Sequence, residues 1–459
     1  MASRYANQSI KFLLSMACVA LFLFPQSVHA LQVAGVGNNF NSVVGGVTVD
    51  ADSVVRGNHK ELSEKIRQQI NQALAKGDAD VSKASGLRVI SLKGLEKAIA
   101  ESMDSGKPLS PEIQYLAGMQ RVEYVMVTPE NDDVLIAGPG EGWKTDNSGN
   151  VVGIKSGMPV VHLQDLLVAM RSVDNAKQSP GISVSINPTA EGSKRYNKII
   201  GKVTAANLNK ATISSLEQAM GPQDIVLTGV PRDSHYSRVL LASDYAMKRL
   251  AMGLEPSPLR KLPSIMETIS RKKMRPNRAA PRMWMECNYE PVAKNEQGTA
   301  WHISGQGVRT QTEETKFDAD GKQVGTGKKM IVAEQWAEKM TKHFEELSAQ
   351  VPVFRDLRNA MDLAVISAII QSEGLLTKVG LELPHIAGSL KTPTFEVPKT
   401  VPSELSYVTS RNSPVLQISG GVIINSWGVA QNDAVKKEMN GVEKVAMNNA
   451  SDRWWWNAK

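Results

Sequence analysis

An uninterrupted run of apolar and small residues extends from Phe12 to Phe24, close to the N-terminus. Arg4 and Lys11 precede it, and Val28-His29-Ala30 supplies the small residues of a cleavage site. This order is typical of a secretory signal peptide. The run is also too short for a helix that crosses a bilayer comfortably. We therefore predict that residues 1–30 are a signal peptide and that the mature protein is exported, outside the cytoplasm.

Removal of the signal peptide removes Cys18 and leaves Cys287 as the single remaining cysteine. No disulfide can then form within the mature chain. Packing must then hold the fold together. Hydrophobic residues make up 42% of the sequence and charged residues 22%, which excludes a mostly disordered chain. The strand-like run Met283–Cys287 predicts a buried thiol. No second apolar run approaches 18 residues, so we expect no transmembrane anchor in the mature chain.

Strand-like and helical patterns follow one another without a regular βαβ rhythm. This favours the α+β class, with mixed and antiparallel sheets, packed helices and two to three subdomains. After the signal peptide we predict an N-terminal α+β domain at 31–180, a central α/β segment at 181–258, a basic proline-containing linker at 259–282, antiparallel hairpins with a helical hairpin at 283–388, and a linker with a C-terminal tail at 389–459.

Local patterns within these segments predict individual elements. Val122–Thr128 and Val134–Ala137 read as the strands of a hairpin, and Leu163–Met170 has the spacing of a helix. The apolar run Val239–Ala242 is strand-like, and Asp244 is placed to cap the helix that follows it. The best helices are predicted at 332–347 and 357–370, and antiparallel strands at 283–310 and 315–326.

Several strings of the sequence resemble a family of uncharacterised exported bacterial proteins that is known only as a domain of unknown function. They are Tyr115–Val125, Ala137–Trp143, His235–Arg249, Gly305–Val308 and Leu357–Val365. The resemblance covers residues 85 to 375. It implies export and a bacterial source, and it transfers no catalytic or binding residue.

The sequence carries no local motif for a metal or a cofactor. The six histidines of the mature chain are widely separated, and neither His-x-His nor His-Glu-x-x-His occurs. Gly138–Gly142 and Gly325–Lys329 lack the following helix or the Ser/Thr of a phosphate-binding loop. We therefore expect no metal and no cofactor.

Asp233–Tyr236 offers the best local candidate for catalysis. Ser234 could act as a nucleophile, His235 as its base and Asp244 as the acid that orients the base. However, adjacent Ser and His side chains on a strand point to opposite faces, and no Gly-x-Ser-x-Gly elbow is present. The alternative is a turn at Asp233 and Ser234, a surface position for His235 and a capping role for Asp244.

Two further features suggest binding. Between residues 260 and 282 the chain carries eight basic residues and a single acid, Glu267. This segment could bind an anionic polymer or an acidic protein, nucleic acid not being expected outside the cytoplasm, or it could be a solvated linker. The anion-binding candidates are Arg271, Lys272, Lys273, Arg275 and Arg278. Trp454–Trp456 could bind sugars, a membrane interface or a partner, or form a frayed tail.

Together these features favour an exported, non-enzymatic binding or structural protein. A hydrolase that uses residues around Asp233–Asp244 is the alternative, and a polyanion-binding module at Arg260–Arg282 is the second alternative.

Overall fold

The computed structural model divides the chain into two compact units, Met1–Asn39 and Phe40–Lys459. It describes residues 80–147, 149–179, 181–272, 280–317, 323–408, 415–448, 450 and 453–458, together with three short strands between residues 43 and 57. The predicted signal peptide lies outside the described residues. The short strands, β1 (Val43–Val44), β2 (Val47–Val49) and β3 (Val55–Gly57), form an antiparallel sheet.

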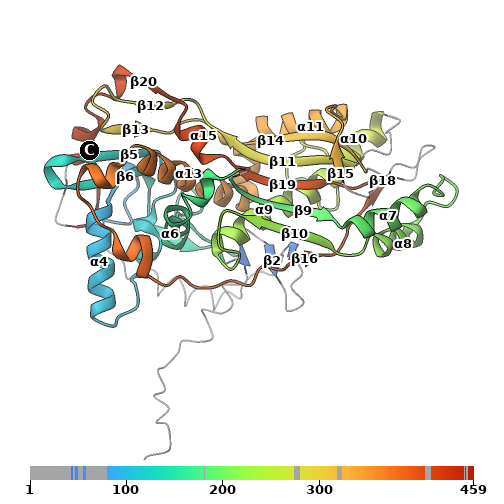
Figure 1. Ribbon diagram of the computed structural model, residues 1–459, viewed down its shortest axis with the longest axis horizontal. Helices are drawn as coiled ribbons and strands as arrows, with labels where there is room; N and C mark the ends of the chain where they lie inside the picture. Colours follow the sequence, from blue (N-terminus) through green and yellow to red (C-terminus); the bar gives the residue numbers. More distant parts are fainter. Residues whose placement is uncertain are drawn as a thin grey trace, which may run out of the picture. The chain divides into compact units, whose positions relative to one another are not determined.

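The second unit contains two seven-stranded mixed sheets with packed helices, which confirms the α+β class (Figure 1). The first sheet has the order β15-β14-β11-β19-β9-β10-β16, and only β11 and β19 are parallel in it. Its strands are β9 (Ile182–Pro188), β10 (Gln223–Thr228), β11 (Ala280–Asn288), β14 (Gly307–Phe317), β15 (Gln323–Gly325), β16 (Thr400–Val401) and β19 (Ser419–Ile424).

The second sheet has the order β20-β12-β13-β5-β6-β4-β21, and only β12 and β20 are parallel. The hairpin predicted at 122–137 is confirmed as its strands β5 and β6. Its strands are β4 (Ser85–Ser91), β5 (Tyr124–Thr128), β6 (Asp133–Gly140), β12 (Val292–Lys294), β13 (Ala300–His302), β20 (Asp433–Val435) and β21 (Trp455–Asn457). Two small hairpins pair β7 (Trp143–Thr145) with β8 (Val151–Gly153) and β17 (Ser406–Tyr407) with β18 (Val415–Leu416).

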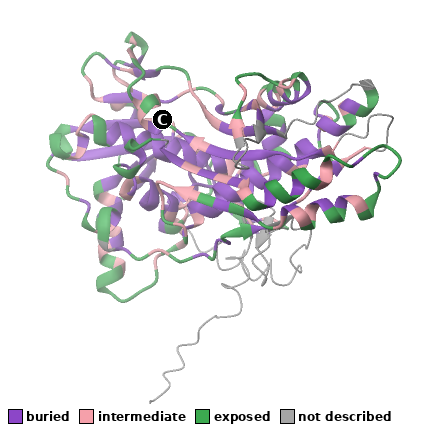
Figure 2. Cartoon of the chain, turned by 45° about the vertical axis from the view of Figure 1, so that its right-hand side comes forward, coloured by how far each residue is buried: buried purple, intermediate pink, exposed green. Residues whose placement is uncertain are grey.

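Three helices pack against one another in the centre of this unit: α6 (Leu163–Arg171), α9 (His235–Met252) and α13 (Val353–Ser372). Helix α9 lies on β9, β11 and β19 of the first sheet, and α13 contacts β14 of the first sheet and β5 of the second. Nearly every residue of α9 and α13 is buried (Figure 2). Among the described residues, no helix combines the length and the apolar character that a membrane crossing requires.

The remaining helices surround these layers. Helix α4 packs on β4 and β6, α7 packs on α8, and α11 lies on β14. Their bounds are α4 (Leu92–Asp104), α5 (Pro111–Gln114), α7 (Ala190–Ile200), α8 (Lys210–Met220), α10 (Ile265–Lys272), α11 (Ile331–Lys342), α12 (Phe344–Gln350), α14 (Leu375–Lys378), α15 (Ser426–Ala430) and α16 (Val442–Met447). The helices predicted at 332–347 and 357–370 correspond to α11 with α12 and to α13.

The strand predicted at Val239–Ala242 is wrong, because these residues belong to α9. The helix begins after Ser234, whose side chain caps the backbone N–H of Ser237, and it ends at Gly253 in the left-handed conformation. Because the helix is packed on all sides, its apolar residues form a continuous run instead of a stripe. A short run of that kind does not distinguish a buried helix from a buried strand.

The C-terminal tail folds back onto the second sheet. Trp455 and Trp456 lie in β21, which pairs with β4, and both indoles are buried. Because strand residues alternate between faces, Trp455 joins the main core and Trp456 a second cluster on the other face. The Trp456 indole donates a hydrogen bond to the carbonyl of Ala446 at 2.7 Å. Trp454 is half-buried beside them.

Candidate functional site

Two histidines and two aspartates lie at the N-terminal ends of the three central helices. His162 is the residue before α6 and Asp165 lies in its first turn, His235 opens α9, and Asp356 lies in the first turn of α13. The N-terminus of a helix is its positive end, so three such ends bring positive potential to this junction. The site therefore collects residues from three distant parts of the sequence at one junction of the core.

The His235 ring is held by Asp165. Its Nδ1 lies 2.9 Å from one oxygen of the Asp165 carboxylate and 3.1 Å from the other, and the two side chains are only 12% and 11% exposed. Burial alone would lower the pKa of His235, but the charge and the hydrogen bond of Asp165 outweigh it, so the pKa of His235 is raised. Nδ1 therefore carries the proton that Asp165 accepts, and Nε2 remains for other chemistry.

The ring of His162 is stacked on that of His235. The two centroids are 4.8 Å apart and the planes differ by 6°. Burial, and then the positive charge of His235, lower the pKa of His162 to about 4. Near neutral pH His162 is therefore a neutral imidazole, whereas the pKa of His235 stacked on it is shifted upward. Environments that separate the pKa values of two neighbouring groups in this way are characteristic of acid–base sites.

A second carboxyl group and an aromatic ring complete the surroundings of His235. Burial raises the pKa of Asp356 to about 7, against the opposing attraction of His235. The ring of Phe395 meets the imidazole of His235 edge to face, with the centroids 5.5 Å apart. On the other side of the stack, Tyr115 meets His162 edge to face at 5.3 Å. These contacts fix both imidazole rings in orientation.

His162, Asp165 and His235 are also the residues of the described chain that come closest to a metal site, with candidate ligand atoms within 4.8 Å of one another. In a tetrahedral site, atoms that bind one zinc ion at 2.0–2.1 Å lie about 3.4 Å from one another. The spacing of up to 4.8 Å between these candidate ligand atoms is wider than that. The stacking is a stronger objection, because a metal in the plane of one imidazole lies out of the plane of a parallel ring. The rings as they stand fit proton transfer better than coordination.

The proposed set of Ser234, His235 and Asp244 is not brought together. Ser234 Oγ donates to the carbonyl of Pro231 at 2.7 Å and caps α9. Asp244 lies in the middle of the same helix, fully buried, and accepts a hydrogen bond from Lys248 at 2.7 Å. His235 is not on the surface either. The acid that orients its ring is Asp165, which precedes it by 70 residues.

The predicted anion-binding segment is described only in part. Arg271 lies in α10, is exposed and pairs with Glu267. Lys272 ends that helix, whereas Lys273, Arg275 and Arg278 lie outside the described residues. The apolar side of α10 is buried in the core through Ile265, Met266 and Ile269.

The predictions of a buried Cys287 and of antiparallel strands at 283–310 and 315–326 can both be compared with the structure. Cys287 lies in β11 and is half-buried, and burial raises the pKa of its thiol to about 12. The thiol is therefore protonated at neutral pH and a poor nucleophile. Strands β14 and β15 pair antiparallel as predicted, but the turn between them lies outside the described residues.

A family model described as a protein of unknown function, DUF1598, matches residues 184–265. The matched stretch runs from β9 into α10 and contains His235, Asp244 and Lys248. The domain of unknown function expected from the sequence is thus found over this part of the chain. No curated protein and no solved structure is detectably similar to the chain.

Proposed function

We propose that the protein is an exported enzyme in which His235, oriented by Asp165, transfers a proton during the hydrolysis of a small substrate. The observation that carries the proposal is the contact of His235 Nδ1 with the Asp165 carboxylate at 2.9 and 3.1 Å, beside a stacked and neutral His162. A carboxylate that fixes the tautomer and the orientation of an imidazole is the arrangement that general acid–base catalysis requires.

Each residue has a distinct part in this proposal. Asp165 accepts the Nδ1 proton and stabilises the imidazolium, so Nε2 of His235 is the atom that gives or takes a proton. Asp356 is the second group that can hold a proton near neutral pH. Among the described residues no hydroxyl hydrogen-bonds to the His235 ring, and Ser234 is engaged as a cap. Water is therefore the nucleophile that we propose.

The test is hydrolysis of p-nitrophenyl acetate, p-nitrophenyl phosphate and p-nitrophenyl glycosides by the mature protein, His235→Gln and Asp165→Asn. His302→Gln is the matched control, because His302 is also half-buried but lies in β13 of the second sheet. Loss of a general base lowers kcat/KM by about 10²–10⁴. We expect that loss for His235→Gln and a loss of at least about tenfold for Asp165→Asn. Equal rates for the wild type and all three variants would contradict the proposal.

Export is the second part of the proposal and rests on the composition of residues 1–30. Expression of the full chain in a bacterial host, followed by mass spectrometry of the N-terminus, tests it. We expect the protein in the periplasm or the medium, beginning at Leu31. Recovery of the uncleaved chain in the cytoplasm would refute it.

A further inference from the structure

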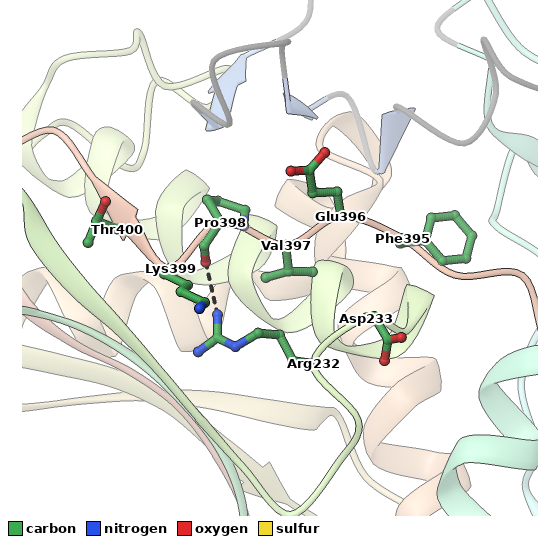
Figure 3. Close-up of a pocket in the computed structure, with 8 residues that line it drawn as sticks. All are labelled: Arg232, Asp233, Phe395, Glu396, Val397, Pro398, Lys399 and Thr400. Carbon is green, nitrogen blue, oxygen red and sulfur yellow. Dashed lines mark hydrogen bonds between the residues drawn. The ribbon is translucent and has the colours of Figure 1, made fainter.

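A cavity of about 610 Å³ lies beside the extended segment Phe395–Thr400, on the side of the first sheet where β16 pairs with β10 (Figure 3). The volume is in the range of small-molecule sites. Phe395 belongs both to the lining of this cavity and to the surroundings of His235. The backbone N–H of Phe395 also donates to the carbonyl of Asp233 at 2.8 Å. Phe395 therefore lies next to both the cavity and the imidazole.

The backbone brings two cationic side chains to the same part of this cavity. Arg232 donates to the carbonyl of Pro398 at 2.9 Å and to that of Ile225 at 2.8 Å, and the backbone N–H of Ile225 donates to the carbonyl of Lys399 at 2.8 Å. Among the residues that the structure describes, neither Arg232 nor Lys399 forms an ion pair with a carboxylate. Two cations and two carboxylates, those of Asp233 and Glu396, therefore line one cavity, and the cations are not paired with these carboxylates.

The orientation of the side chains gives the cavity its polarity. Figure 3 shows the ammonium group of Lys399 directed toward the guanidinium of Arg232, while the carboxylates of Asp233 and Glu396 point away from it. Arg232 uses two of its five N–H donors on carbonyls, and the remaining donors and those of Lys399 are available. Like charges held together repel unless an anion lies between them.

We propose that this cavity binds a small oxyanion, a carboxylate or a phosphate group, between Arg232 and Lys399. A guanidinium and an ammonium are the groups that proteins use most for such ligands. If the proposed function is right, the oxyanion is part of the substrate. The anion site itself depends on the two cations and not on the catalysis.

Isothermal titration calorimetry with inorganic phosphate, and separately with succinate, at constant ionic strength tests the proposal. Lys399→Gln is the test variant, because the Lys399 side chain is exposed and its replacement leaves the core unchanged. Lys391→Gln is the control, since it is exposed in the same segment but does not line the cavity. We expect binding to the wild type and to Lys391→Gln, and an affinity about ten- to a hundredfold lower for Lys399→Gln. If only phosphate binds, the oxyanion is a phosphate group. If only succinate binds, it is a carboxylate.

Two results would overturn the proposal. One is the absence of a binding signal for both anions at about 10 mM, and the other is equal affinity for Lys399→Gln and Lys391→Gln. His235→Gln separates this proposal from the proposed function, because it should bind the anion as the wild type does. An anion site that survives in a protein without hydrolase activity leaves the cavity proposal standing and refutes the catalytic one.

Discussion

The buried ion pair between Asp244 and Lys248 allows a sharp prediction about stability. Asp244 is fully buried and Lys248 is 6% exposed. Lys248 donates to Asp244 at 2.7 Å and to the carbonyls of Gly420 and Ile186 at 3.0 and 3.4 Å. Burial raises the pKa of Asp244 to about 6 and lowers that of Lys248, so both charges are held at a cost to the fold.

The perturbation is the pair of single variants Asp244→Leu and Lys248→Met, together with the double variant. Removal of one partner leaves a buried charge without its counter-charge, which costs about 3–5 kcal/mol of the free energy of unfolding. Removal of both partners leaves only the carbonyls of Gly420 and Ile186 without their donor. This loss lowers the free energy of unfolding by about 1–3 kcal/mol. The double variant should therefore be more stable than either single variant, with a coupling of about 6 kcal/mol.

Urea unfolding followed by tryptophan fluorescence measures the free energy of unfolding of the wild type and of the three variants. If the double variant loses as much stability as the two single variants added together, the pair does not act as a unit and the reasoning is refuted. The pH dependence gives a second check. Because the folded state holds the Asp244 proton more tightly than the unfolded state, this residue makes stability fall as the pH rises from about 4 through 6. That fall should be smaller in Asp244→Asn than in the wild type.

Two further predictions concern the packing of the sheets. Trp456→Ala should destabilise the protein by about 3–5 kcal/mol and expose the C-terminal tail to limited proteolysis, because Trp456 is buried on the second sheet and bonded to Ala446; an unchanged cleavage pattern would contradict the fold-back. Gly421→Ala should prevent or severely weaken folding, because the new Cβ would lie 1.7 Å from the carbonyl oxygen of Val184; a circular dichroism melt that matches the wild type would refute this contact.

The elements that the sequence predicts correctly are those with a strong local signal. The β5–β6 hairpin has two β-branched runs around a polar turn, and α6 has a clear apolar spacing, so both follow from neighbouring residues alone. Between the helical turn that ends at Ser389 and β16, the proline-containing chain forms neither helix nor strand. Its packing is different, because burial of Phe395, Val397 and Val401 depends on distant parts of the chain.

The candidate site depends on contacts that no local pattern records. His162 and Asp165 are three residues apart on the first turn of α6, a weak signal at most, and they meet His235 only because α6 and α9 pack together. The interpretation of Val239–Ala242 as a strand also separated Asp244 from the helix that contains His235. Ser234, the nucleophile candidate of the sequence, uses its hydroxyl to cap α9 and to bond the carbonyl of Pro231.

The most direct test of the central claim is the titration of His162 and His235 by NMR, with ¹⁵N-labelled histidine and assignment by His162→Gln. We predict that His162 titrates well below pH 5, near its pKa of about 4, and that His235 titrates above its ordinary value of 6.5 with the proton held on Nδ1. Asp165→Asn should lower the pKa of His235. Two histidines that both titrate near pH 6.5, unaffected by Asp165→Asn, would contradict the proposed acid–base site.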